Sequence, residues 1–300
     1  MDPWLDVGRM RLLREVALRG SIAAAARGLG LTPSAVSQQL TVLEREAGTV
    51  LLDRSSRGVL LTGAGSALVD RARSIVELLE SARADLDRLA GELAGTVRVG
   101  TVASAAGGLV SQAAGRLAGD HSALELTVVV AEPGTTIDAL LRGDLDMAVV
   151  DVYDGVPVRM PDYLVSTELR VEPLLVVSQP AAFPGGAGIA LSALSGRDWV
   201  MPPMEAACGQ AVRLACRAAG FEPRVRWETD DMLLLVRAVA AGHGVAVLPQ
   251  LAVADDVAEV STRRLVRPVL HRRLLALTRS ASQDRPVVRA VLNELIKAAS

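Results

Sequence analysis

Residues 31–46 read LTPSAVSQQLTVLERE, and their pattern predicts a helix with two unlike faces. Thr32 can cap its start, and Pro33 suits its first turn, where a missing N–H removes no hydrogen bond. On a helical wheel one face is apolar, with Val36, Leu40, Leu43 and Ala47. The opposite face carries hydroxyls, an amide and one cation, namely Ser34, Gln38, Thr41 and Arg45, with Ser37 at its edge. A solvated surface is one interpretation, although such faces usually carry Lys and Glu.

The segment before this helix gives the polar face a second interpretation. An Ala-rich helix is expected at residues 22–29, with Ser21 as its cap and Gly30 at its end. Two short helices joined by a tight Gly turn predict a helix-turn-helix, whose second helix enters the major groove of DNA. Gln can bond adenine twice, Ser and Thr bond several base edges, and Arg bonds guanine or phosphate. We therefore predict DNA contacts at Thr32, Ser34, Ser37, Gln38, Thr41 and Arg45.

The next segment, LLDRSSRGVLLTGAG at residues 51–65, is typical of a β-hairpin. Residues 53–58 form a polar turn between two short apolar runs. A hairpin after a helix-turn-helix is a wing, and Arg54 and Arg57 would then reach phosphates or the minor groove. Two exposed arginines in an ordinary loop are the alternative.

One long helical pattern covers residues 63–93. Its apolar positions alternate four and three residues apart, as in a coiled coil. We name them the leucine seam: Leu68, Ala72, Ile75, Leu79, Ala82, Leu86, Leu89 and Leu93. Packing on the protein's own core is one interpretation. The narrowness of the seam favours pairing with a second chain, with dimer contacts at Leu68, Ile75, Leu79, Leu86 and Leu89.

From residue 95 onward, strand patterns alternate with helical patterns, which predicts an α/β fold with a parallel sheet. Strands are expected at residues 96–101, 124–130, 145–150, 171–178, 198–201, 224–228, 245–248 and 274–278. The last strand and helix are expected to return to the first lobe. Lobe I then covers about 95–163 and 268–300, and lobe II about 164–267, with a cleft suited to a small ligand.

The run GSIAAAARGLGLTPSAVSQQLTVLEREAGTVLLDRSSRGVLLTGAG at residues 20–65 resembles the N-terminal signature of LysR-type transcriptional regulators. Leu13 and Leu52 stand where that family usually has Phe, and Pro33 where it often has Gln. GDLDMAVV at residues 143–150 and AAGHGVAVLP at residues 240–249 look like segments of the family's effector-binding domain. That domain is itself similar to periplasmic solute-binding proteins.

The resemblance implies a winged helix-turn-helix at residues 1–62, a linker helix at 63–93 and a two-lobed effector domain at 95–300. It implies a regulator that binds double-stranded DNA as a homodimer or homotetramer and responds to a small-molecule effector, with RNA polymerase as a further partner. By the resemblance, the effector contacts are Thr101, Ser104, Asp146, Met201, Pro202 and His243. A structural role is the alternative for each: backbone N–H groups could hold Asp146, and His243 could be a satisfied turn residue.

The composition, 50% hydrophobic and 22% charged, is typical of a globular protein. With a net charge of −2, any DNA-binding surface must be local. No apolar run is long enough to span a membrane, and the N-terminus lacks the pattern of a signal peptide. Two cysteines fit a reducing compartment, so we expect a cytoplasmic protein.

Groups that could carry catalysis are scattered: His121, His243 and His271 lie far apart, and G-x-S-x-G is absent. We expect no enzyme activity, no metal and no other cofactor. Cys208 and Cys216 leave open a thiol-redox sensor, since a peroxide-sensing branch of the family has a cysteine pair in this region. A solute-binding protein would need a signal peptide and no helix-turn-helix. An interaction protein with a coiled-coil rod would leave the N-terminal signature unexplained.

Overall fold

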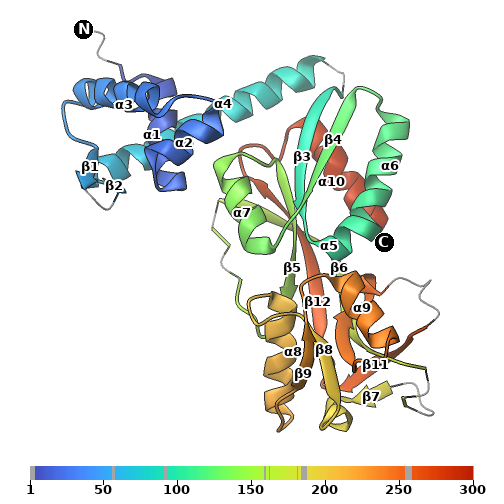
Figure 1. Ribbon diagram of the computed structural model, residues 1–300. Coiled ribbons are helices and arrows are strands. Elements are labelled where there is room, and N and C mark those ends of the chain that lie inside the picture. Colours follow the sequence, from blue (N-terminus) through green and yellow to red (C-terminus); the bar gives the residue numbers. More distant parts are fainter. Residues whose placement is uncertain are drawn as a thin grey trace. The chain divides into compact units, whose positions relative to one another are not determined.

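The computed structural model describes residues 4–55, 58–90, 93–158, 160–161, 163–180, 182–183, 188–253 and 259–299. The chain divides into two compact units, Met1–Gly91 and Glu92–Ser300. Figure 1 colours them along the sequence from blue to red. Among the described residues, no helix combines the length and apolar character needed to cross a bilayer.

The first unit contains four helices and a hairpin in its described part: α1 (Val7–Arg19), α2 (Ile22–Leu29), α3 (Pro33–Ala47), β1 (Leu52–Ser55), β2 (Gly58–Leu61) and α4 (Gly63–Ala90). Local sequence sets the ends of the helices. The Ser21 hydroxyl accepts the Ala24 N–H and the Thr32 hydroxyl accepts the Ala35 N–H, as the capping pattern predicts. Gly30 ends α2 in the left-handed conformation, at φ 66°, where a side chain would be strained.

The core of this unit forms where α1, α2 and α3 meet. Leu13, Val36 and Leu43 are fully buried there. Ala25 and Ala26 on α2 are also fully buried, and their small side chains let α2 and α3 approach closely. The apolar face of α3 therefore lies inward, and its polar face is left outside.

The first part of α4 also belongs to this core. Val69 and Ala72 are buried, and Leu68 and Ile75 pack against the same cluster. Leu68 and Ile75, two of the predicted dimer contacts, are therefore partly covered by their own unit, and their contact with a second chain stays a prediction. Leu93 is outside the helix, because α4 ends at Ala90, and it packs against the core of the second unit.

The second unit is built on a mixed sheet in the order β4-β3-β5-β12-β6-β11-β7, with β10 also pairing with β6. Its strands are β3 (Gly95–Thr101), β4 (Leu124–Val130), β5 (Met147–Tyr153), β6 (Leu164–Ser178), β7 (Gly188–Ala190), β8 (Asp198–Met201), β9 (Arg224–Glu228), β10 (Ala246–Pro249), β11 (Ser261–Arg267) and β12 (His271–Arg279). Its helices are α5 (Ala103–Ala105), a π-helical stretch (Ala106–Val110), α6 (Ser111–Asp120), α7 (Pro133–Arg142), α8 (Ala207–Ala218), α9 (Met232–Ala240) and α10 (Pro286–Ala299). The sequence did not predict β7 or β11.

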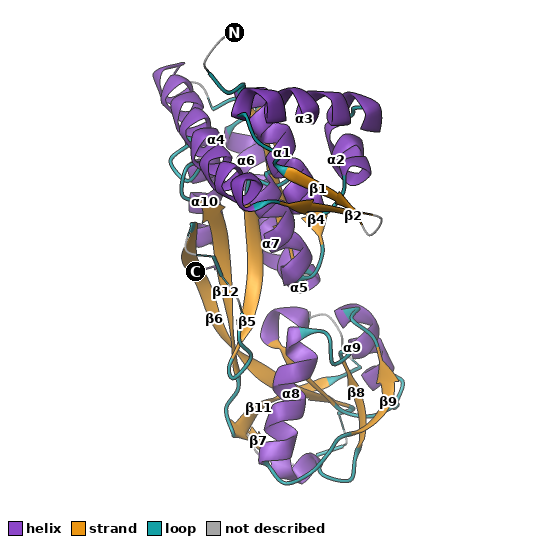
Figure 2. Ribbon diagram, turned by 90° about the vertical axis from the view of Figure 1, so that its left-hand side faces the viewer, coloured by secondary structure: helices purple, strands orange, loops and turns teal. Residues whose placement is uncertain are grey.

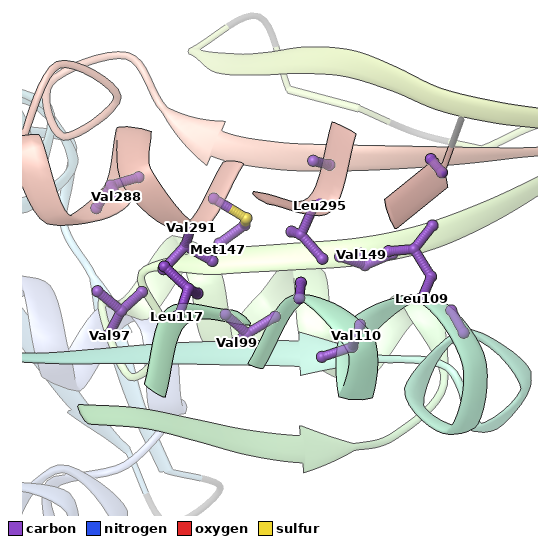
Figure 3. Close-up of a cluster of buried hydrophobic side chains, with 14 of the residues drawn as sticks. Val97, Val99, Leu109, Val110, Leu117, Met147, Val149, Val288, Val291 and Leu295 are labelled. Atoms are coloured by element: carbon purple, nitrogen blue, oxygen red, sulfur yellow. The ribbon is translucent and has the colours of Figure 1, made fainter. Parts of the chain in front are cut away.

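Lobe I has helices on both faces of its sheet. Figure 3 shows α6 and α10 over β3 and β5, with Val99, Leu117 and Val291 among the packed side chains. On the other face, Ala148 and Val150 of β5 pack against Ile137 and Leu140 of α7. Every residue of β5 is buried, as is usual for a strand covered on both faces.

The lobes join within a continuous strand. The first part of β6, from Leu164 to Pro173, pairs with β12 in lobe I. Its last residues, Leu174 to Ser178, pair with β10 and β11 in lobe II. The outgoing crossover therefore lies near Pro173, later than the predicted position near Tyr163. The return crossover follows β11, close to the predicted Arg267. Figure 2 shows the two lobes, with α8 and α9 in lobe II.

Candidate DNA-reading face and ligand cleft

The polar face of α3 is exposed as the sequence predicts. Ser34, Gln38, Thr41 and Arg45 are exposed, and Ser37 is half-buried at the edge of this face. The Thr41 hydroxyl donates to the Ser37 carbonyl at 3.0 Å, and the Ser34 and Thr32 hydroxyls lie 3.1 Å apart. The predicted contact residues thus form one continuous surface of short polar groups, with Arg45 in the last turn.

An ion pair and several hydrogen bonds hold α3 against its neighbours. The Arg9 guanidinium on α1 donates to Gln39 at 2.9 Å and to Glu46 at 2.5 Å. The Glu44 carboxylate accepts the backbone N–H groups of Leu51 and Leu52, at 3.0 and 3.2 Å. Glu44 therefore fixes the start of the hairpin relative to α3, a role that the sequence analysis missed.

The hairpin forms as predicted, with Asp53 opposite Leu60 and Arg54 opposite Val59. The predicted turn at residues 53–58 is too long, because residues 53–55 belong to β1 and Gly58 begins β2. The Arg54 backbone belongs to β1. The structure does not describe the Arg54 side chain, and Arg57 lies outside the described residues. Their predicted phosphate contacts remain predictions.

The second half of α4 exposes leucines. Leu79 and Leu86 are 56% and 61% exposed, and Leu78 is 74% exposed. The Leu89 side chain lies outside the described part of the chain. Leucines exposed at coiled-coil spacing are unfavourable in water, which supports the prediction that this half of the helix pairs with a second chain.

The second unit contains a cleft between its lobes. Its wider part encloses about 550 Å³, within the usual range for a small-molecule site. The wide part is lined by Ala103, Ser104, Gly107, Gly108, Arg170, Asp231, Met232, Leu233, Gln250, Leu251, Ala252 and Val253. A narrower part shares Ala103, Ser104 and Met232 with it and adds Val102, Glu132, Asp151, Pro202, Ala206, Ala207, Cys208 and Asp230.

Strand direction explains this lining. Val102 follows β3, Glu132 follows β4, and Pro202 follows β8. Asp230 and Gln250 follow β9 and β10 in the same way. Ligand sites in open α/β sheets form at the carboxyl ends of strands, because the loops of neighbouring strands gather there.

A buried charge cluster lies next to the cleft and contacts two of its lining residues, Ser104 and Asp151. The fully buried Arg272 guanidinium on β12 donates to Glu172 Oε1, with Nε at 2.8 Å, and to Ser104 Oγ at 2.6 Å. Asp151 Oδ2 lies 3.5 Å from the same guanidinium and accepts the Tyr153 hydroxyl at 2.9 Å. Because Arg272 occupies an acceptor position of Ser104, the Ser104 hydroxyl proton is left to donate elsewhere.

We name Glu132, Asp151 and Asp230 the acidic end of the cleft. Glu132 and Asp230 are exposed. Partial burial raises the pKa of Glu132, and repulsion by the Asp151 and Asp230 carboxylates raises it further. Among the described residues, no group of three His, Cys, Asp or Glu side chains could hold a metal ion.

Two of the six predicted effector residues, Ser104 and Pro202, line the cleft. Thr101 and Met201 are the last residues of β3 and β8, and their side chains are buried in the lobes. Asp146 and His243 precede β5 and β10, so they lie at the opposite ends of those strands.

Other contacts occupy Asp146 and His243. Asp146 accepts the Arg98 N–H at 2.9 Å and an Arg285 N–H at 2.9 Å, which is the structural alternative stated for it. The His243 ring stacks on Trp227 with centroids 4.9 Å apart. Glu132, Asp230 and Arg272 were not predicted from the sequence, although Glu132 and Asp230 are polar residues that follow predicted strands.

The cysteines do not form a redox pair in this structure. Both lie on α8, and a helical rise of ~1.5 Å per residue puts their Cα atoms roughly 12 Å apart, too far for a disulfide. Both are buried, and burial raises the pKa of each thiol to about 12. A reactive cysteine needs the opposite conditions, exposure and a lowered pKa.

Comparison with known families finds two matches. The family model described as "LysR substrate binding domain" matches residues 90–300, and the model described as "Bacterial regulatory helix-turn-helix protein, lysR family" matches residues 7–66. The match boundaries enclose the cleft and the helix-turn-helix with its hairpin.

Individual proteins agree with the family models. The small neutral protease regulatory protein of Streptomyces coelicolor is 33% identical, over 79% of this chain and 75% of the relative. A probable regulator named LrrA from Synechococcus elongatus is 26% identical over 97% of this chain and 96% of the relative. Full-length OxyR from Pseudomonas aeruginosa has a TM-score of 0.70 at 20% identity, covering 97% of this chain and 95% of that chain. CbnR in complex with its target DNA has a TM-score of 0.57 at 20% identity, covering 98% and 100%.

Proposed function

This chain belongs to the LysR family of bacterial transcriptional regulators, and from that membership we propose how its parts divide the work: the exposed face of α3 reads base edges in the major groove, and the cleft between the lobes holds the effector. The chain is a DNA-binding regulator with an effector-binding domain.

The observation that carries the DNA-reading proposal is the chemistry of the α3 surface. Ser34, Gln38 and Thr41 are exposed and uncharged, while Val36, Leu40 and Leu43 on the apolar side of the same helix are fully buried. Charged groups bind phosphates of every sequence alike, whereas short amides and hydroxyls discriminate between base edges. This surface therefore suits selection among sequences more than general attraction to DNA.

The same proposal includes two chains paired through Leu79 and Leu86 on the second half of α4. Pairing would hold two α3 helices at a fixed distance, as a pseudo-palindromic site requires. We also propose a cytoplasmic location, dimers or tetramers as the working state, and RNA polymerase as a partner. The function involves no catalytic step.

For the effector, the cleft offers a cavity of small-molecule size. It lies beside Arg272 and Glu172, which face each other across the two strands that run between the lobes. If two arrangements of the protein differ in DNA binding, a ligand in the cleft shifts the balance between them only when it binds one arrangement more tightly than the other.

A selection experiment with Gln38→Ala tests the base-reading role. Protein and variant are each used to select bound fragments from a randomised DNA pool, and the preferred sequences are compared. We expect Gln38→Ala to lose preference at one base position, worth ~1–3 kcal/mol. Gln39→Ala is the matched control, because Gln39 bonds Arg9 within its own unit and should leave base preference unchanged.

If Gln38→Ala weakens DNA binding equally for every sequence, base reading by this side chain is excluded. The proposal that α3 reads DNA sequence fails if the unaltered protein, at ordinary salt, binds its selected fragments no more tightly than shuffled fragments.

A further inference from the structure

The fully buried Arg272 decides which hydrogen bonds Ser104 can make, and Ser104 lines both parts of the cleft. This inference rests on the proposed function, in which the cleft holds the effector, and concerns the group that the effector presents there. The Arg272 guanidinium donates to Ser104 Oγ at 2.6 Å. A guanidinium has N–H donors, no acceptor and a permanent charge, so the serine oxygen is the acceptor in this contact.

Glu172 holds Arg272 in that position. The Glu172 side chain is 1% exposed, and its Oε1 atom accepts two guanidinium N–H groups, with Arg272 Nε at 2.8 Å. Its Oε2 atom accepts the Leu251 N–H at 3.1 Å, from a residue that lines the wide part of the cleft. Both carboxylate oxygens are therefore occupied. Turning the guanidinium away from Ser104 would leave buried charges without their partners, which is costly.

The Ser104 proton needs an acceptor from outside the protein. Among the residues that the structure describes, Ser104 is in contact with Arg272 and donates to no acceptor. A ligand group with donors alone could use the second lone pair of the hydroxyl, but it would leave the proton unpaired and lie beside a positive guanidinium. An acceptor oxygen pairs with the proton, and the bond from Arg272 polarises the hydroxyl and strengthens its donation.

The walls of the wide part suit an apolar body attached to that oxygen. Met232, Leu233 and Leu251 line this space of about 550 Å³. Leu233 is 55% exposed, so a ligand that covers it removes apolar surface from water, which is favourable.

We propose that the ligand of this cleft is a mainly apolar molecule that presents an acceptor oxygen to the Ser104 hydroxyl, and that Arg272 is the positioning residue that keeps this hydroxyl a donor.

Cyclohexanone and methylenecyclohexane test the assignment, because they share one ring and differ in whether a C=O or a C=CH₂ group projects from it. Saturation-transfer NMR titrations on the full-length protein give a dissociation constant for each compound. Variants are compared for the same compound, since the two compounds lose different hydration on binding. We expect Ser104→Ala to weaken cyclohexanone by about three- to tenfold, which corresponds to one hydrogen bond, and to leave methylenecyclohexane unchanged.

Ser280→Ala is the matched control. Ser280 is exposed just beyond the other end of β12, and its hydroxyl donates to the Tyr163 carbonyl at 2.8 Å. This change should leave the binding of both compounds as it is in the unaltered protein. Circular dichroism melts verify that each variant is folded.

Arg272→Met combined with Glu172→Gln tests the positioning role, because it removes both charges of the buried pair and leaves neither unpaired. Cyclohexanone should weaken to the level of Ser104→Ala, while methylenecyclohexane keeps its affinity. Equal weakening of both compounds would show a structural role only and overturn the positioning role. An independent readout needs no change at Arg272: cyclohexanone should shift the Arg272 N–H resonances of the unaltered protein, but not those of Ser104→Ala.

Undiminished binding of cyclohexanone to Ser104→Ala, or failure of cyclohexanone to bind the unaltered protein, overturns the proposal. If methylenecyclohexane alone binds, the acceptor assignment is wrong and the cleft is still a ligand site. The DNA selection uses ligand-free protein and is decided separately.

Discussion

Replacing Leu79 and Leu86 together by Asp should separate the paired chains. The two leucines are 56% and 61% exposed in one chain, so a partner helix could bury somewhat more than half of each side chain. Full burial of a leucine is worth ~1.5–3 kcal/mol, which leaves about 0.8–1.8 kcal/mol for each. Two leucines in each of two chains give about 3–7 kcal/mol, and the dimer dissociation constant should rise at least about a hundredfold.

Sedimentation velocity over a dilution series measures this change. Leu60→Asp is the matched control, because Leu60 is 64% exposed in the same unit but lies on β2. It should leave the association unchanged. Ile75→Asp provides the contrast within α4: Ile75 packs against the core of its own unit, so that change should lower the melting temperature of the unit. A Leu79→Asp, Leu86→Asp protein that still sediments as a dimer at every concentration would refute this reasoning and place the interface elsewhere.

Further measurements address the wing, the thiols and the cleft. Arg57→Ala should weaken binding to all DNA sequences alike and reduce the salt slope by about one unit; an unchanged slope excludes a phosphate contact there. Cys208 and Cys216, with pKa values of about 12, should resist Ellman's reagent at mild alkaline pH until the protein is unfolded, and fast reaction of the native protein would revive the redox alternative. Burial and neighbouring carboxylates raise the pKa of Glu132, so its ionised form opposes folding once the pH exceeds the unfolded-state pKa. Glu132→Gln should therefore raise the melting temperature at about pH 7 and have no effect at about pH 3, where Glu is protonated in both states; a lower melting temperature at pH 7 contradicts the assigned repulsion.

The elements of the first unit could be predicted because their signals are local. Ser21 and Thr32 cap helices, and Gly30 adopts a conformation that other residues avoid. The two faces of α3 follow from its own periodicity. The surface that packs against an apolar face cannot be predicted in this way, because a heptad pattern does not show which surface covers it. Leu68 and Leu79 look alike in sequence, yet one packs on the unit's own core and the other is exposed.

The cleft was only partly predictable, for a geometric reason. Ser104 and Pro202 come after strands and line it, whereas Asp146 and His243 come before strands and lie at the other ends. Arg272 could not have been found from local pattern, since its role depends on pairing with Glu172, far away in the chain. No sequence signal marks the change of partners within β6 near Pro173.

The double connection between the lobes restricts how they can move. β6 and β12 are hydrogen-bonded to each other from Leu164 and Arg279 up to Pro173 and His271, where both strands reach lobe II. Sliding one strand along the other would break that ladder and separate the buried Arg272 and Glu172 charges, whereas flexing the two-stranded ribbon as a whole breaks neither. We therefore expect the lobes to respond to a bound molecule by a hinge bend about the ribbon rather than by a shear.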